Sequence, residues 1–236
     1  MMDIIPVIDV QHGIAVHATR GHRSGYLPLK TPLAPSSDPV AVALGLRSVF
    51  AFPTLYVADL DGIEGRGRNL DLPAKLAQTL PDVTIWIDDG ASPRDAADRM
   101  RCGGGATVVL GSENVSSAPE VATLRSMPVD SYVLSLDFKE DRFAGAPTLV
   151  EDARHWPDRV IVMTLARVGS NEGPDIARVA GIVDRSGGRL VFAAGGVRNL
   201  ADVEALRSAG AAGVLVATAL HAGTLTAGDL EKIAGR

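Results

Sequence analysis

The chain has 236 residues, of which 46% are hydrophobic and only 4% are aromatic, and its formal net charge is −5. This length suits a single α/β barrel with a core built from aliphatic side chains. The acidic balance argues against broad binding to nucleic acid or to a membrane surface, so an anionic ligand has to be held by local groups.

Short β-branched runs alternate with amphipathic stretches along the whole chain. The runs cover residues 3–10, 55–61, 83–89, 107–112, 131–138, 159–165, 189–196 and 212–218. The stretches between them have helical patterns, and several begin at an Asp, Ser or Asn that can cap a helix. Strict alternation of strands and helices predicts parallel βαβ units, and this number of units favours a closed (β/α)8 TIM barrel over an open sheet.

The first predicted strand is followed by a long connection, residues 11–37. Within it, GIAVHAT at residues 13–19 predicts a short extra strand. Connections of this length in compact domains are often functional. We therefore consider Arg20 and Arg23 as substrate-binding residues that close over a bound anion with bidentate contacts, and the alternative is a solvated loop.

An internal repeat links the two halves of the chain. The aligned segments are residues 7–18 with 135–146, and residues 86–112 with 192–218. The first pair places Asp9 over Asp137, and the second runs without gaps. The repeat predicts a half-barrel duplication, with halves of about residues 1–128 and 129–236 in one domain spanning residues 1–236.

Carboxylates stand at the ends of opposite predicted strands. Asp9 ends the first strand and Asp137 the fifth, so the two would face each other across the barrel mouth, where barrel enzymes place their chemistry. Two carboxylates in unlike environments can take opposite roles in proton transfer. We predict Asp9 and Asp137 as the catalytic pair, and the alternative is that each caps a turn or pairs with a neighbour.

Glycines after the seventh predicted strand indicate a phosphate site. Gly195 and Gly196 precede a predicted helix, and Ala217 and Thr218 end the eighth strand. Glycine lets the backbone approach an anion, a following helix supplies N–H donors, and these two loops commonly bind phosphate in such barrels. The alternative is a tight turn that needs glycine for steric reasons alone.

The matching position after the third predicted strand carries acids. Asp88 and Asp89 directly precede Gly90, the counterpart of Gly196. Two carboxylates would repel a second phosphate, so we predict that they bind another substrate group, together with Asp59 from the second strand. The alternative is that Asp59, Asp61, Asp88 and Asp89 together form an oxygen-rich cation site.

These residues resemble ProFAR isomerase of histidine biosynthesis and its relative, the cyclase subunit of imidazole glycerol phosphate synthase. The matching motifs are IIPVIDVQHGIAV, LYVADLDGI, LDF, AAGGVRNLADVEAL and GVLVATALHAGTLT, in order along essentially the whole chain. The resemblance implies a half-barrel duplication, a two-carboxylate site and a ligand bearing phosphate.

Residue by residue, the resemblance implies Asp9 as general base, Asp137 as general acid and Thr164 as an assisting group. It implies one phosphate cradle at Gly195, Gly196, Ala217 and Thr218, and the remnant of a second at Gly111 and Ser112. The family reaction opens an aminoaldose and isomerises it to an aminoketose. It needs no metal or organic cofactor, so the resemblance implies a metal-independent isomerase or lyase without a cofactor.

The chain also departs from this pattern. Asp88 and Asp89 replace glycine-rich sequence, Ala217 replaces a glycine, and residues 16–31 and 165–175 differ from the usual family phrases. With ALHAG at residues 219–223, these departures make the chain similar to a sister branch, the ProFAR-isomerase-related proteins. That branch occurs with methanopterin- and methanofuran-dependent one-carbon metabolism.

Three functions follow as hypotheses. The leading one is acid/base chemistry on a phosphorylated sugar or sugar-amine metabolite with a single phosphate. The others are the standard isomerase of histidine biosynthesis and a non-catalytic barrel that binds a phosphorylated metabolite. The expected partner is a phosphorylated small-molecule substrate. We expect no binding to nucleic acid or membrane, and we expect the protein to be a monomer or a small homo-oligomer. No apolar stretch approaches the ~20 residues of a membrane span, and we expect a cytoplasmic protein.

Overall fold

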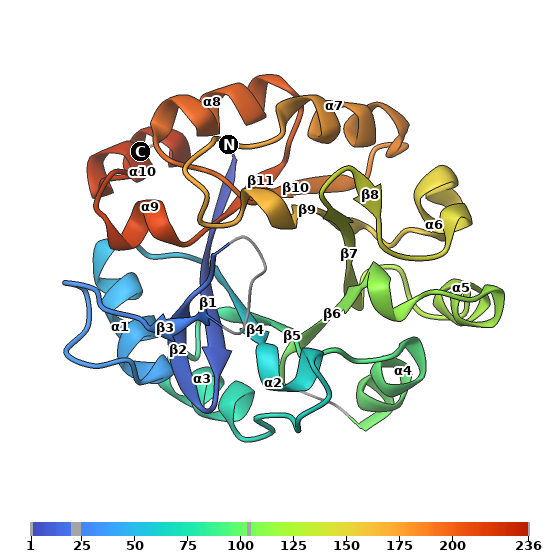
Figure 1. The fold of residues 1–236 in the computed structure, drawn as a ribbon, viewed down its shortest axis with the longest axis horizontal. Helices are drawn as coiled ribbons and strands as arrows, with labels where there is room; N and C mark the ends of the chain where they lie inside the picture. Colours follow the sequence, from blue (N-terminus) through green and yellow to red (C-terminus); the bar gives the residue numbers. More distant parts are fainter. Residues whose placement is uncertain (1, 20–24, 103–104, 236) are drawn as a thin grey trace.

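A computed structural model of the chain describes residues 2–19, 25–102 and 105–235. Within these ranges, eight parallel strands close into a barrel with helices around it, which confirms the predicted TIM barrel (Figure 1). The barrel strands are β1 (Asp3–Gln11), β4 (Thr54–Asp59), β5 (Thr84–Asp88), β6 (Thr107–Gly111), β7 (Tyr132–Lys139), β9 (Arg159–Thr164), β10 (Leu190–Ala194) and β11 (Gly213–Val216). Pairing of β11 with β1 closes the barrel. Arg20 and Arg23 lie outside the described residues.

Helices cover the outside of the barrel. They are α1 (Pro39–Val49), α3 (Leu72–Thr79), α4 (Pro93–Cys102), α5 (Ala118–Arg125), α6 (Pro147–Glu151), α7 (Ile176–Arg185), α8 (Leu200–Ser208) and α10 (Ala227–Ala234). Shorter turns follow strand ends, namely α2 (Leu60–Ile63), α9 (Thr218–His221), and the 3-10 turns η2 (Ser112–Asn114) and η4 (Leu165–Arg167). A further 3-10 turn, η3 (Ala153–His155), lies between α6 and β9. Caps expected from the sequence are present, since Asp38 accepts from Ala41 N and Asn199 from Asp202 N.

Two apolar layers result from the alternation of side chains along each strand. The larger layer packs between the barrel and its helices, and the smaller one fills the barrel interior. Trp86 of β5 and Phe192 of β10 meet in the interior layer, with ring centroids 5.2 Å apart in an edge-to-face arrangement. This packing closes the interior beneath the carboxyl ends of the strands. No helix in the described ranges is long and apolar enough to cross a membrane.

The repeat recurs in the hairpins that extend β1 and β7. β1 pairs antiparallel with β2 (Ile14–His17), which is the extra strand predicted in the first connection, and β2 pairs with β3 (Leu27–Pro28). β7 pairs in the same way with β8 (Arg142–Phe143). The turns hold His12 at φ 53° and Glu140 at φ 55°, and these two positions are aligned by the repeat. Aligned residues thus adopt the same uncommon backbone conformation.

The second aligned pair keeps its register as well. β10 and β11 begin at Leu190 and Gly213, each 106 positions after the first residue of β5 and β6. The division into half-barrels at about residue 128 stays a prediction.

Candidate functional site

A pocket opens at the carboxyl ends of the barrel strands. Seven of the residues predicted for the site line it: Asp9, Asp88, Asp137, Gly195, Gly196, Ala217 and Thr218. Five others do not line it, namely Asp59, Asp89, Gly111, Ser112 and Thr164. β1 and β7 lie on opposite sides of the strand order, so Asp9 and Asp137 enter the pocket from opposite walls.

Asp137 is a buried carboxyl group held by hydroxyl donors. Its side chain is 7% exposed and accepts a 2.6 Å hydrogen bond from Ser135 Oγ. Burial raises the pKa of Asp137 to about 7, although the bond from Ser135 opposes this shift. The group therefore exists in both protonation states near neutral pH, as a general acid requires. Asp9, across the pocket, is only half-buried.

Ser112 and Gly111 support Asp137 from behind. Asp137 N donates to Ser112 Oγ at 2.9 Å, and Ser112 Oγ donates to the Ala144 carbonyl oxygen at 2.5 Å. A Cβ at Gly111 would lie 3.1 Å from Asp137 Oδ2, so glycine leaves room for the carboxylate. Ser112 is fully buried, and its hydroxyl is engaged away from the pocket surface. Gly111 and Ser112 thus contact Asp137 from the side away from the pocket, and their predicted phosphate contact stays a prediction.

Asp88 enters the pocket with neutral partners. Its side chain is 9% exposed, and Tyr56 Oη donates a 3.0 Å hydrogen bond to its Oδ2. Gly90 N donates to the other carboxylate oxygen at 3.4 Å. Burial raises the pKa of Asp88 to about 6, while the bond from Tyr56 lowers it. Tyr56 was not anticipated from the sequence, although it stands on β4 in the interior layer.

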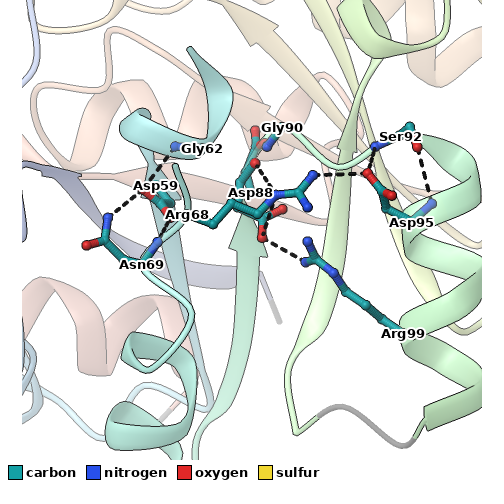
Figure 2. Close-up of polar contacts among 10 residues, drawn as sticks. Asp59, Gly62, Arg68, Asn69, Asp88, Gly90, Ser92, Asp95 and Arg99 are labelled. Carbon is teal, nitrogen blue, oxygen red and sulfur yellow. Dashed lines mark hydrogen bonds and ion pairs between the residues drawn. The ribbon is translucent and has the colours of Figure 1, made fainter. Parts of the chain in front are cut away.

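Asp89 does not share the pocket with Asp88. Its Oδ2 lies 2.8 Å from Arg99 Nη1 and 3.6 Å from Arg68 Nε, and its side chain is 6% exposed. Arg68 also donates to the Asp89 carbonyl oxygen and reaches Asp95 on α4 at 3.0 Å (Figure 2). Asp88 therefore lines the pocket and Asp89 does not, because adjacent strand residues point to opposite faces. Substrate binding by the two acids stays a prediction.

Asp59 is likewise committed to the protein itself. Its carboxylate accepts from Asn69 N at 2.6 Å and from Asn69 Nδ2 at 2.7 Å, and it caps α2 through Gly62 N (Figure 2). Its predicted role in substrate binding stays a prediction, and Asp59 does not line the pocket. Among the residues that the structure describes, no group of three or more His, Cys, Asp or Glu is placed to hold a metal ion. Asp59, Asp61, Asp88 and Asp89, the four acids of the alternative cation site, do not form such a group.

The glycine turn after β10 lines the pocket with backbone. Gly195 and Gly196 adopt φ 103° and 87°, where other residues are strained. A Cβ at Gly195 would lie 2.6 Å from the Thr164 carbonyl oxygen, and one at Gly196 would lie 2.4 Å from the Gly173 carbonyl oxygen. The glycines thus serve tight packing and also leave the pocket wall without side chains. Thr164 is buried at the end of β9 and contributes to this packing.

Ala217 and Thr218 continue the same wall at the start of α9. His221, from the last turn of α9, lines the pocket beside them, and its Nδ1 lies 3.1 Å from Thr31 Oγ1. Burial lowers the pKa of His221 to about 4, so the ring is neutral at physiological pH. The ALHAG motif had marked this histidine without indicating its place.

The pocket therefore has two chemically different sides. Asp88, Glu113 and Asp137 lie on the side formed by β5, η2 and β7. Glycines and short side chains form the side of β10 and β11. No lysine or arginine lines it among the described residues. Glu113, missed by sequence reasoning, pairs with Lys139 Nζ at 2.7 Å.

Comparison with known proteins gives a consistent set of similarities. A family model described as "Histidine biosynthesis protein" matches residues 3–226. An uncharacterized protein of Methanocaldococcus jannaschii is 29% identical, over 98% of this chain and 97% of that protein. Two relatives carry the name 1-(5-phosphoribosyl)-5-((5-phosphoribosylamino)methylideneamino)imidazole-4-carboxamide isomerase. The one from Natronomonas pharaonis is 31% identical over 95% of both chains. The one from Arthrobacter is 26% identical over 100% of this chain and 96% of its own.

Proposed function

The chain belongs to the histidine biosynthesis protein family, and from this premise we propose that it is an acid/base enzyme for a phosphorylated sugar or sugar-amine metabolite. The observation that carries the proposal is the pairing of two carboxylates from opposite strands in one pocket. Asp9 of β1 and Asp137 of β7 line the pocket together with the glycine turn after β10. This combination supports proton transfer on a ligand held by a phosphate group.

The geometry favours Asp137 as the acid. Its burial keeps a proton on the carboxyl group near neutral pH, so it can protonate the ring oxygen as the C1–O bond breaks. The half-buried Asp9 then takes the proton from C2 as base. The nitrogen lone pair forms a C1=N bond as the C1–O bond breaks, so the C2–H electron pair can form a C1=C2 double bond while the C1=N π electrons return to nitrogen. Transfer of a proton to C1 and loss of the C2 hydroxyl proton give the aminoketose. Each positioned proton transfer contributes roughly 10²–10⁴-fold in rate.

We place a single phosphate at Gly195, Gly196, Ala217 and Thr218. The glycine turn exposes backbone to the pocket, and Thr218 begins a helix whose first N–H groups lack intrahelical partners. The opposite side carries Asp88 and Glu113, and a phosphate there would meet like charge. The substrate is therefore a monophosphate rather than a bisphosphate.

We also propose a place in one-carbon cofactor biosynthesis, on the strength of the resemblance to the sister branch. The genes that flank this one provide the test. Neighbouring genes for one-carbon cofactor enzymes support the placement, and a histidine operon contradicts it.

A second candidate is the isomerase of histidine biosynthesis. It is favoured by the names of relatives that cover 95% or more of this chain. Expression in a histidine auxotroph that lacks this isomerase decides between the two. Growth without histidine supports the second candidate, and lack of growth at good expression contradicts it.

Catalysis itself is tested in D2O with a panel of aminoaldose monophosphates. We expect the wild-type protein to form the ketose with deuterium incorporated at C1, as monitored by NMR. Asp9→Asn and Asp137→Asn should lose this activity. Asp98→Asn is the matched control, because Asp98 is exposed on α4 and forms a surface pair with Arg101. Tight phosphate binding without exchange or isomerisation in any member of the panel would favour the non-catalytic binding barrel.

A further inference from the structure

Two adjacent acids at the end of β5 are treated differently by the rest of the protein. Asp89 is neutralised by Arg99 at 2.8 Å, with Arg68 beside it at 3.6 Å. Among the residues that the structure describes, Asp88 receives hydrogen bonds only from the hydroxyl of Tyr56 and the N–H of Gly90. Figure 2 shows Arg68 and Arg99 gathered at the end of β5, and neither is among the residues lining the pocket that Asp88 enters.

The partners of the other acidic residues in the pocket do not bring a positive charge to Asp88. Glu113 is paired with Lys139, which stands outside the pocket lining. Asp137 is held by the side-chain hydroxyl groups of Ser135 and Ser112, which are neutral. A carboxylate buried without a cation is costly, unless it is protonated or a ligand supplies the missing charge.

We propose that Asp88 is a specificity-determining residue that accepts hydrogen bonds from a protonated amino group of the substrate. The substrate is then a monophosphate with a cationic amine at the end remote from the phosphate. The orientation rests on the proposed function, which places the phosphate at the turn after β10. β5 and β10 lie on opposite sides of the strand order, so the two recognition sites face each other across the pocket.

An ammonium group suits Asp88 better than a hydroxyl group does. A hydroxyl donates one hydrogen bond but leaves the buried negative charge uncompensated. An ammonium brings three donors and the opposite charge to a pocket whose described lining has no lysine or arginine. Charge-assisted hydrogen bonds are also about twice as strong as neutral ones.

Tyr56 is the positioning residue for Asp88. Its side chain is 2% exposed, and its hydroxyl fixes the carboxylate from beneath. The same bond lowers the pKa of Asp88 against the effect of burial, and it therefore favours the ionised form that binds an amine. The titratable groups that face Asp88 are Tyr56 of β4, Asp89 of the same loop, Glu113 of η2 and Asp137 of β7.

Matched probes test the proposal directly. 5-Aminopentyl phosphate and 5-hydroxypentyl phosphate differ only in the group that would meet Asp88, and calorimetry at about pH 7.5 gives their affinities. We expect the amine to bind at least about tenfold more tightly to the wild-type protein, and Asp88→Asn to reduce the preference below about twofold. Inorganic phosphate should bind equally to both proteins, and Asp98→Asn should keep the preference.

Tyr56→Phe gives a second readout that a folding defect would not mimic. Without the hydroxyl, the pKa of Asp88 rises, so the pH midpoint of the amine preference should move upward by about 0.5–1 unit. An unchanged midpoint contradicts the role of Tyr56. Equal affinity of the wild-type protein for the two probes, with inorganic phosphate still bound, overturns the proposal for Asp88.

Failure of the proposed phosphate site has a different signature. In that case the wild-type protein does not bind inorganic phosphate. The phosphate-free pair, pentylamine and pentanol, then tests Asp88 alone. A preference for pentylamine that disappears in Asp88→Asn supports the amine site, and the absence of a preference overturns it.

Discussion

The turns after β5 and β10 occupy matching positions of the repeat, and each contains a glycine at positive φ at the same aligned position. Gly90 and Gly196 adopt φ 69° and 87°, and both follow strands whose aromatic residues touch inside the barrel. The turn after β5 presents Asp88 to the pocket and anchors Asp89 on the outside. The turn after β10 presents Ala194 and two glycines. One scaffold thus supports opposite electrostatic surfaces.

The comparison teaches that the backbone turn and its chemistry are separable. The positive φ of the glycine is required wherever the following loop packs tightly against a neighbouring strand end. The residue two positions before that glycine, Asp88 or Ala194, lines the pocket and is the one to which we assign ligand preference. The two turns can therefore be perturbed independently, and the following experiments exploit this.

The largest effect is expected from glycine substitution. In Gly196→Ala and Gly90→Ala the added Cβ would lie 2.4 Å from the Gly173 carbonyl oxygen and 2.7 Å from Ile63 Cα, respectively. Each should lower the free energy of unfolding by about 2–4 kcal/mol in urea titrations. Only Gly196→Ala should weaken phosphate binding, by about tenfold or more.

The control for these glycine variants is Gly188→Ala. Gly188 has φ +88° but no neighbouring atom within 4 Å of an added Cβ, so it measures backbone strain without a clash. Equal loss of phosphate affinity in Gly90→Ala and Gly196→Ala would erase the distinction between the two turns.

The next effect is the part of the pH dependence of stability that Asp88 contributes. The pKa of Asp88 is raised to about 6 in the folded state, so its contribution to stability is present below about pH 4 and lost as pH rises through 6. The loss amounts to at most about 3 kcal/mol. The difference in the free energy of unfolding between Asp88→Asn and the wild type should therefore be about 1–3 kcal/mol more favourable to the variant at pH 8 than at pH 4.

Ala194→Ser is the matched change on the β10 side, since Ala194 aligns with Asp88 and the substitution adds no titratable group. Its free energy of unfolding, measured by denaturation at pH 4 and pH 8, should change with pH as that of the wild type does. A pH dependence that is the same in wild type and Asp88→Asn would show that Asp88 does not carry it.

A smaller effect is expected from the outward-facing acid. Arg99→Gln removes the cation at 2.8 Å from the buried Asp89 carboxylate, and the free energy of unfolding should fall by about 1–3 kcal/mol. Ligand affinity should change less than about twofold. Arg101→Gln is the control, since its pair with Asp98 is exposed and contributes about 0–1 kcal/mol. If Arg99→Gln lost ligand binding while its stability stayed unchanged, Asp89 would have a role in ligand binding and not in stability.

The smallest effect is expected from a variant that makes the turn after β5 chemically similar to the turn after β10. Asp88→Ala makes the β5 side resemble the β10 side and removes like charge from the pocket. The affinity for pentane-1,5-diol bisphosphate relative to pentyl phosphate should rise about tenfold by calorimetry. Asp82→Ala, at an exposed acid that pairs with Arg47, should leave the ratio unchanged. An unchanged ratio in Asp88→Ala would mean that Asp88 does not exclude a second phosphate.

Much of the fold was predictable because it depends on local patterns. The run at 83–89 became β5 at Thr84–Asp88, and the first connection contains the strand expected at 13–19. Strand order in a barrel follows chain order, which placed Asp9 and Asp137 opposite each other. The outward orientation of Asp89 also had a signal, since Asp88 shares its strand face with Trp86 and Asp89 does not.

Sequence by itself thus determined the architecture, the repeat and the identity of the strand-end residues, because hydrophobic periodicity and short connections restrict topology. Only the tertiary structure decided which of these residues face the pocket and which partners they meet. Tyr56 reaches Asp88 from 32 positions away, and Arg68 reaches Asp95 from 27 positions away. Such contacts depend on the register between neighbouring strands and loops, and they decide whether a carboxylate is neutralised by the protein or left for a ligand.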